Sequence, residues 1–543
     1  MANVPAASDA EVAELPQGET FLGHPAGLFL LFFVEMWERF SYYGMRALLV
    51  LYLKAAIDGE NPGRGWTEGQ AATLYGWYTG LAYLFPIFGG MIADKFIGTH
   101  RSMLVGGTLI AIGHIILGLS GIGALAENAA GMSLFVVGLA TIVLGTGHFK
   151  PTVSVMVGQL YPAGDPRRDG AFTIFYMGIN LGAFLSAFVC GSLGESERFG
   201  WHWGFGAAAV GMILGMIAYS FGRPLFLKGV GEAPPEAASR ATLYSFGFLA
   251  LSLVLAAVFG GLYHVGELAK VQELMSYIAG HAFLKWLVPG VLTGIVLAWS
   301  VLFVLKNRPE DRGAVITILV FMLFNAFFWI AFEQAGSSIN VFTLEKTDRV
   351  IPWLSFGGKP FEVPATWFQS INAGLIFLLA PLFSWIWTQL AKKGANPSQP
   401  SKIGLGLFFL GVGYVFTVWA GVNAAPDGAK AGMWLIFATY FWHTVGELCL
   451  SPTGLSYVTK AAPKQFVSLL MGLWFVSSFI ANLGGGLIAA QVENIESGAT
   501  KLPWSFGGRA DFFFLFVVTS FGAAAVVFAL TPLLKKLMVN VKE

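Results

Sequence analysis

The chain has 543 residues, of which 56% are hydrophobic and only 12% are charged, and its formal net charge is +1. So little polar surface excludes a soluble protein of this length. Apolar stretches of about 20 residues recur from end to end, which indicates a polytopic α-helical membrane protein. A transmembrane barrel would show alternating segments of about ten residues, which the sequence lacks. The near-neutral charge and the lack of basic runs argue against nucleic acid as a partner.

Fourteen membrane spans are predicted from apolar runs that are bounded by charges and by Pro/Gly turns. They lie at residues 26–54, 70–93, 102–122, 132–158, 170–192, 202–222, 238–262, 283–306, 313–340, 367–391, 402–422, 432–458, 465–490 and 511–535. If the N-terminus is cytoplasmic, the cytoplasmic loops carry more of the 32 Lys and Arg residues than the outer loops do. This bias predicts that both termini are cytoplasmic, as an even number of spans requires.

The predicted spans divide into two sets of six. We expect an N-terminal six-helix bundle at 26–222, a C-terminal six-helix bundle at 313–536, and a linker at 223–312 with two extra spans. Short tails flank them at 1–25 and 537–543, and the first, a disordered tail, lacks the basic start of a signal peptide. Two six-helix halves around a central site are the architecture of a secondary transporter. The segment from Ser337 to Thr366 is expected to be a solvated loop.

The first span carries a stripe of polar side chains at membrane depth. Ionisable groups there are costly, so they face a protein interior or a water-filled path. At about 100° per residue, the side chains of the stripe share an arc of about 140° on one helix face. They are Glu35, Glu38, Arg39, Tyr42, Tyr43 and Arg46. An inward-facing polar stripe predicts a transporter rather than a membrane anchor.

Three more charged residues, Lys150, Glu333 and Glu447, fall inside later spans. Together with the first span they give four carboxylates against three permanent cations. A buried carboxylate without a partner takes up a proton instead of staying charged. This balance predicts the proton as the coupling ion. The alternative is a set of structural ion pairs that lock helices together.

The run from Gly89 to Arg101 joins the second and third spans and places Asp94 at a helix end. Its glycines permit a tight turn and a close approach between helices. In this position the run is similar to the loop signature of the major facilitator superfamily. We expect it to act in the conformational change rather than in substrate binding.

Polar residues also lie in the middle of several later spans. Lys150 precedes Pro151, which bends a helix and frees a backbone carbonyl beside a wet cavity. The amides of Asn180 and Asn372 are at mid-membrane, and Trp474 offers an aromatic wall. Cations in the N-terminal half suit a carboxylate, whereas Glu447 and the amides suit an ammonium group. This polarity fits a short zwitterion such as a small peptide.

Five motifs together resemble the proton-dependent oligopeptide transporter (POT) family of the major facilitator superfamily. They are Glu-x-x-Glu-Arg at 35–39, the loop at 89–101, Lys-Pro at 150–151, Phe-Tyr-x-x-Ile-Asn-x-Gly at 175–182 and Gly-Glu-Leu-x-Leu-Ser-Pro at 446–452. They cover both halves in the family's order, and the inserted span pair is similar to that of bacterial members. The resemblance implies an all-α major facilitator fold. It also implies proton-coupled import of di- and tripeptides by alternating access.

The resemblance further implies roles for individual residues. Proton coupling is assigned to Glu35, Glu38, Arg39 and Glu333. The peptide carboxylate is assigned to Arg46 and Lys150, its amino group to Asn180, Asn372 and Glu447, and the pocket wall to Tyr42, Tyr43, Tyr83, Ser451 and Trp474. Gating is assigned to Asp94, Arg101 and a Lys150–Glu447 pair across the halves. The second span, Tyr75 to Lys95, lacks the histidine of animal members, so proton handling is expected to rest on carboxylates.

Two alternatives remain open at this point. A transporter with the same fold and proton coupling could carry nitrate, a drug or another small anion, although an anion carrier has no obvious need for Glu447. A membrane enzyme is disfavoured, because the chain lacks His-Glu-x-x-His, Gly-x-Ser-x-Gly and clustered-carboxylate metal motifs. We expect no cofactor, no metal site, no disulfide between Cys190 and Cys449 and no obligatory protein partner. The expected location is the lipid bilayer of the bacterial cytoplasmic (inner) membrane.

Overall fold

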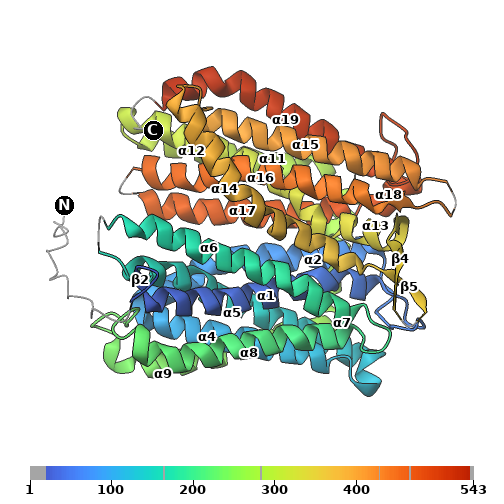
Figure 1. Cartoon of the computed structure of the whole chain (residues 1–543), viewed down its shortest axis with the longest axis horizontal. Coiled ribbons are helices and arrows are strands. Elements are labelled where there is room, and N and C mark those ends of the chain that lie inside the picture. The colour runs from blue at the N-terminus through green and yellow to red at the C-terminus, as the bar shows by residue number, and fades with distance from the viewer. Residues whose placement is uncertain are drawn as a thin grey trace.

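A computed structural model describes residues 20–162, 165–281, 284–356, 358–426, 428–463 and 466–538. Its long helices run side by side in two layers, with the N-terminal helices in one layer and the C-terminal helices in the other (Figure 1). Short 3₁₀ and π-helical segments, labelled η, extend or interrupt several of the α-helices.

The N-terminal half consists of the elements up to α8. They are β1 (Thr20–Phe21), β2 (His24–Pro25), α1 (Ala26–Lys54), α2 (Glu68–Leu84), α3 (Pro86–Ile92), η1 (Ala93–Ile97), α4 (Gly98–Leu119), η2 (Gly123–Ala126), α5 (Ala129–Gln159), α6 (Arg167–Ser186), η3 (Ala187–Gly191), α7 (Ser192–Gly194) and α8 (Trp201–Phe226). A linker follows, with η4 (Ala238–Arg240), α9 (Ala241–His264), α10 (Glu267–Gly280) and α11 (Leu284–Lys306).

The C-terminal half contains the remaining elements. They are α12 (Pro309–Phe332), η5 (Glu333–Gly336), α13 (Ser338–Lys346), β3 (Thr347–Asp348), β4 (Val350–Phe356), β5 (Lys359–Glu362), η6 (Ala365–Phe368), α14 (Gln369–Lys392), α15 (Gln399–Asn423), β6 (Ala431–Gly432), α16 (Met433–Ala461), α17 (Val467–Ala489), α18 (Val492–Glu496) and α19 (Ala510–Leu537). The described strands form only three two-stranded sheets, β1–β2 and β4–β5 antiparallel and β3–β6 parallel.

Local sequence explains where several helices begin and bend. Thr67 and Gln70 form a capping box at the start of α2, in which each side chain accepts a hydrogen bond from the other residue's backbone N–H. Pro86 separates α2 from α3, because proline has no backbone hydrogen to donate. Pro151 lies inside α5, immediately after Lys150.

Glycines allow two helix pairs to meet backbone to backbone. A Cβ atom on Gly89 would lie 2.0 Å from the carbonyl oxygen of Gly147, and one on Gly182 would lie 2.1 Å from that of Met36. Because glycine has no side chain, α3 packs directly on α5 and α6 directly on α1. These contacts bring the predicted site residues on α1, α5 and α6 into one bundle.

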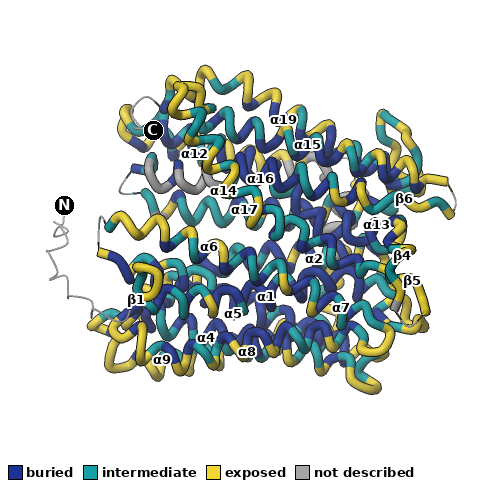
Figure 2. Tube along the Cα trace, in the orientation of Figure 1, coloured by how far each residue is buried: buried dark blue, intermediate teal, exposed yellow. Residues whose placement is uncertain are grey.

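Each half has its own buried core. Buried apolar residues gather along α1, α4 and α5 in one half and along α12, α15 and α19 in the other (Figure 2). Of the linker helices, α9 packs on α4 and α5, whereas α11 packs on α12. The two linker helices are therefore attached to different halves.

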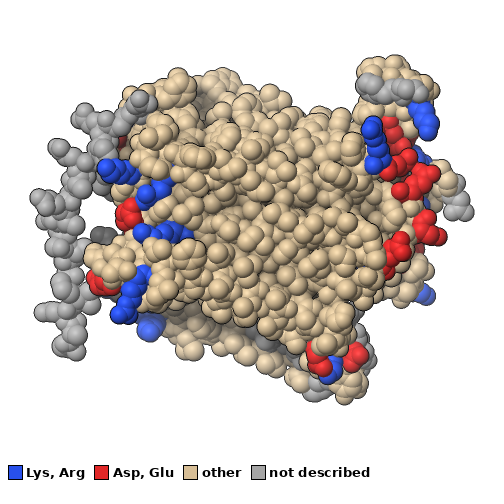
Figure 3. Space-filling view, turned by 90° about the horizontal axis from the view of Figure 1, so that it is seen from below, with Lys and Arg blue, Asp and Glu red and all other residues tan. Residues whose placement is uncertain are grey.

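The helix lengths and the surface indicate a membrane-spanning protein. Ten helical stretches among the described residues are long and apolar enough to cross a membrane. Because one of them, Glu68–Leu119, holds two predicted spans, these stretches account with α1, α11 and α16 for all fourteen predictions. A wide belt without charged side chains separates the two ends on the face in Figure 3. Basic side chains prevail at the left end of that view and acidic ones at the right end.

The two ends can be named by what lies there. The strands β4 and β5 mark the hairpin end, and β2 with the end of α19 marks the termini end (Figure 1). The prediction of a solvated loop from Ser337 to Thr366 was wrong in its first part. Residues Ser338 to Thr343 are buried in α13, which lies against both halves, and only the β4–β5 hairpin is largely exposed. Helix α10 was also not foreseen.

Candidate transport site

The polar stripe of α1 forms a buried ion-pair cluster. Arg39 Nε lies 3.0 Å from Glu35 Oε1 and 2.5 Å from Glu38 Oε2, and each of the three residues is at most 6% exposed. The Arg39 guanidinium also lies over the Tyr42 ring, 5.5 Å from its centroid. All four residues belong to one helix, so a movement of the halves against each other leaves this cluster intact.

A second ion pair of α1 joins the two halves. Arg46 Nη2 lies 2.7 Å from Oε2 of Glu333, the first residue of η5. Tyr75 on α2 lies beside this pair, and its hydroxyl accepts a hydrogen bond from Arg46 Nε at 2.6 Å and donates to Glu333 at 3.4 Å. The structure therefore brings together two residues that were assigned to different tasks. The sequence analysis assigned no role to Tyr75, because aromatic residues are common near the start of a membrane span.

Lys150 lies on α5 with an aromatic neighbour. Its Nζ is 3.3 Å from the centroid of the Tyr83 ring, an arrangement typical of a cation–π contact. Among the described residues, no carboxylate lies within ion-pair distance of Lys150. Both side chains are partly exposed. The ammonium group is therefore positioned to receive an anion.

The carboxylate of the site, Glu447, lies on α16 and contacts α14. Asn372 Nδ2 donates to Glu447 Oε2 at 2.8 Å and to Thr444 Oγ1 at 3.0 Å. Glu447 is 7% exposed. Ser451 follows one turn later on α16, and Trp474 lies on α17. In this conformation Glu447 and Lys150 are not within ion-pair distance of each other, so their predicted pairing stays a prediction.

The remaining pocket residues lie on α1 and α6. The rings of Tyr42 and Tyr43 meet edge to face at 5.3 Å, and Arg46 lies 5.5 Å from the centroid of the Tyr43 ring. Asn180 Nδ2 donates to the backbone oxygen of Tyr176 on the same helix at 3.0 Å.

Of the predicted gating residues, Asp94 lies within η1 and Arg101 lies in the first turn of α4. Asp94 is exposed. Arg101 is 3.5 Å from Glu232 of the linker, and His100 N donates to Gly231 O at 2.9 Å. The segment 89–101, which forms the end of α3, η1 and the start of α4 rather than a loop, is thus held by the linker on the N-terminal half. No contact tests its assigned role in gating.

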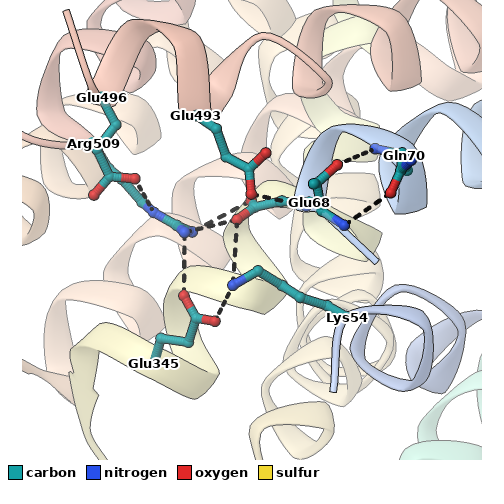
Figure 4. Close-up of polar contacts among 8 residues, drawn as sticks. Lys54, Glu68, Gln70, Glu345, Glu493, Glu496 and Arg509 are labelled. Carbon is teal, nitrogen blue, oxygen red and sulfur yellow. Dashed lines mark hydrogen bonds and ion pairs between the residues drawn. The ribbon is translucent and has the colours of Figure 1, made fainter. Parts of the chain in front are cut away.

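A cluster of charged residues closes the hairpin end between the halves, and the sequence analysis missed it (Figure 4). Arg509 contacts Glu68 at 2.7 Å, Glu345 at 3.1 Å and Glu496 at 3.0 Å. Lys54 lies 3.9 Å from Glu68 and also pairs with Glu345. Burial alone would lower the pKa of Arg509, but the surrounding carboxylates outweigh it and hold that pKa above its usual value.

The polar contacts between the halves are absent from one end of the described molecule. Among the described residues, every hydrogen bond or ion pair between them lies at the hairpin end or at mid-membrane. The termini end of the described chain has none of these bonds. The structure is therefore closed at the hairpin end.

Fold and site together define a secondary transporter. Two bundles of long helices enclose charged groups from both halves, and among the described residues the hydrogen bonds and ion pairs between the halves leave the termini end free. Among the described residues, no group of three or more His, Cys, Asp or Glu side chains could hold a metal ion.

Comparison with known sequences gives the family. The sequence profile of the POT family matches residues 100–505. The peptide transporter YePEPT of Yersinia enterocolitica is 37% identical over 492 residues, which cover 88% of this chain and 90% of that protein. A di-/tripeptide transporter of Lactococcus lactis subsp. cremoris is 33% identical and covers 89% of this chain and 92% of its own length.

Solved structures agree with this result. A crystal structure of peptide transporter POT with sulfate has a TM-score of 0.76 and 33% identity, and the match covers 97% of this chain and 98% of that one. A mutant of the same transporter with alafosfalin has a TM-score of 0.74. The chain belongs to the POT family, and the predicted major facilitator fold is confirmed. The prediction that the protein is a transporter and not an enzyme is confirmed as well.

Proposed function

We propose that this protein is a proton-coupled symporter that imports di- and tripeptides across the bacterial cytoplasmic membrane by alternating access. One observation carries the proposal. An ammonium group on α5 and a carboxylate on α16 lie on opposite halves at mid-membrane and are not paired with each other. A zwitterion between them would satisfy both charges. Relatives that are named di-/tripeptide transporters support this choice of cargo.

In this proposal the two poles hold the two ends of the peptide. Lys150 and Arg46 bind its carboxylate, because each carries a positive charge on the N-terminal half. Glu447, with Asn372 and Asn180, binds its amino group. The side chains of Tyr42, Tyr43, Tyr83, Ser451 and Trp474 line the space between the poles. No cofactor is needed, since the proton gradient supplies the driving force.

Proton coupling rests on the carboxylates that are paired with arginines. A proton on Glu333 removes the charge that attracts Arg46, which weakens a bond between the halves at 2.7 Å. The cluster of Glu35, Glu38 and Arg39 adds further carboxylates to the proton path within α1. These assignments make proton uptake and the opening of the hairpin end parts of one step.

Two rigid bodies move in this proposal. They correspond to residues 26–222 and 313–536, joined by the linker 223–312, with tails at 1–25 and 537–543. Lys150 and Glu447 pair when the termini end closes, and the loop with Asp94 and Arg101 guides that closure. Because α9 and α11 pack on different halves, the linker spans the moving interface.

The charge distribution supports the orientation. Basic side chains prevail at the termini end in Figure 3, and cytoplasmic loops are the more basic ones. Both termini are then cytoplasmic, and the structure faces inward. The protein meets peptides, protons and the lipid bilayer, with no nucleic acid and no obligatory protein partner.

Uptake of labelled dialanine into liposomes that contain the purified protein tests the proposal. An inward proton gradient should drive accumulation that an ionophore abolishes. Di- and tripeptides should compete, whereas free amino acids should not. Competition by nitrate or drugs instead of peptides would show that the transporter carries another cargo. Accumulation that is unchanged by the ionophore would contradict proton coupling.

A further inference from the structure

The start of α14 receives its cap from the other half of the molecule. The first backbone N–H groups of a helix have no partner within the helix and need an acceptor. Pro364 precedes η6, and its side chain cannot accept a hydrogen bond. Instead, Glu195, which follows α7 of the N-terminal half, accepts hydrogen bonds from Ala365 N at 2.8 Å and from Thr366 N at 2.8 Å.

A third bond completes this contact. The hydroxyl of Thr366 donates to Glu195 Oε1 at 2.6 Å, so both carboxylate oxygens are engaged. A carboxylate at a helix start also interacts favourably with the helix dipole. Two neighbouring bonds also join the halves: Trp367 Nε1 on η6 donates to Ser192 Oγ on α7 at 3.0 Å, and Ser370 Oγ on α14 donates to Phe184 O on α6 at 2.8 Å.

The position of α14 matters for the peptide site. Asn372 lies six residues after Thr366 on the same helical segment and bonds Glu447. On the N-terminal side, Asn180 lies on α6, which continues through η3 into α7 and Glu195. The Glu195 contact thus fixes the spacing between α6 and α14, each of which carries a residue that is proposed to bind the peptide.

We propose that Glu195 is a positioning residue that holds the hairpin end closed by capping η6 and α14 across the interface. This inference rests on the proposed alternating-access function. Opening the hairpin end removes the cap and leaves the N–H groups of Ala365 and Thr366 to water. Loss of an N-cap changes a folding or docking equilibrium by roughly five- to thirty-fold. Removing Glu195 should shift the equilibrium toward the open hairpin end by that ratio.

Distances between two spin labels test this directly. Arg198 and Asp348 are exposed at the hairpin end on opposite halves and serve as label sites, after Cys190 and Cys449 are replaced by alanine. In Glu195→Ala we expect a longer-distance population that is roughly five- to thirty-fold larger relative to the short one. Glu197→Ala removes an exposed carboxylate from the same loop and should leave the distances unchanged.

Two milder variants keep the test decisive if Glu195→Ala does not fold. Thr366→Ala removes one of the three bonds and should shift the distances in the same direction but less. Glu195→Gln should also shift the distances. Thr366→Ala should then shift them less in the Glu195→Gln background than in the native chain, because both substitutions act on the same contact. Unchanged distances in Glu195→Gln and Thr366→Ala would overturn the proposal. The distance measurement does not depend on transport. A shifted distance distribution in a protein that fails to carry peptides would therefore still support the role of Glu195 in holding the hairpin end closed.

Discussion

Replacing Arg509 with methionine is expected to weaken closure at the hairpin end. Its side chain is 5% exposed and lies 2.7 Å from Glu68, which is 1% exposed and belongs to the other half. Breaking a buried ion pair costs about 3–5 kcal/mol, because a buried charge is left without compensation. Lys54 stays 3.9 Å from Glu68, and Glu345 and Glu496 are 33% and 31% exposed, which reduces that cost. We expect about 2 kcal/mol against the closed state, or about 30-fold in the ratio of states.

Spin labels near this cluster provide the assay. Asp58 and Ser497 are exposed on opposite halves, next to α1 and α18. In Arg509→Met the long-distance population should grow by about 30-fold relative to the short one. Arg308→Ala is the matched control, because Arg308 and Glu310 are 74% and 68% exposed, and surface pairs contribute little.

A double variant separates charge from packing. If the lost compensation of Glu68 causes the shift, Arg509→Met combined with Glu68→Gln should recover much of the closed population. A double variant as open as Arg509→Met alone would refute the electrostatic explanation. An equal shift in Arg308→Ala would refute the claim that burial decides the effect.

Three further predictions concern the transport site and its framework. Glu447→Gln and Lys150→Ala should each abolish concentrative uptake in liposomes while the protein stays folded, since each removes one pole of the proposed pocket; full uptake by either would contradict that assignment. Glu35→Gln and Arg39→Ala should spare peptide counterflow more than proton-driven accumulation, and a parallel loss of both would place the α1 cluster in peptide binding. Gly89→Val should lower the thermal unfolding midpoint, because even a Cβ would lie 2.0 Å from Gly147 O, whereas Gly206→Val, on α8 with no atom within contact of its Cβ position, is the matched control and should leave the midpoint nearly unchanged.

The sequence predicted the spans well because each is a long apolar run between charges. The first prediction, 26–54, coincides with α1 (Ala26–Lys54). The prediction failed at Ser338 to Thr343, where polar residues read as a loop. Those residues are buried because Asn340 donates to Ala47 O across the interface and Thr343 bonds within its own helix. Polarity alone does not distinguish a solvated segment from a buried one whose polar side chains bond to other parts of the protein.

The contacts that close the hairpin end were beyond the reach of pattern reasoning. Glu68 and Arg509 are 441 residues apart, and Glu195 and Thr366 are 171 apart. Each lies near a helix end, where charged residues usually meet water, so nothing in the local sequence marks them. The motif residues were recognisable because they are charged within apolar spans. The sequence did not reveal which of these residues pair with each other. Arg46 was assigned to the peptide and Glu333 to the proton, whereas the structure joins the two in one ion pair.

The placement of the ion pairs links the proposed coupling to the opening of the hairpin end. Glu35, Glu38 and Arg39 lie on one helix, so their charges stay compensated whichever end is open. Arg46 and Glu333 lie on opposite halves, so opening the hairpin end must separate them. Arg46 then keeps a neutral partner in Tyr75 Oη, 2.6 Å away within its own half. Glu333 keeps no cation in its own half among the described residues, so separation of the halves leaves the two partners of this ion pair in unequal surroundings. In the proposed cycle, proton exchange at Glu333 therefore accompanies opening of the hairpin end, and closure returns Arg46 to Glu333.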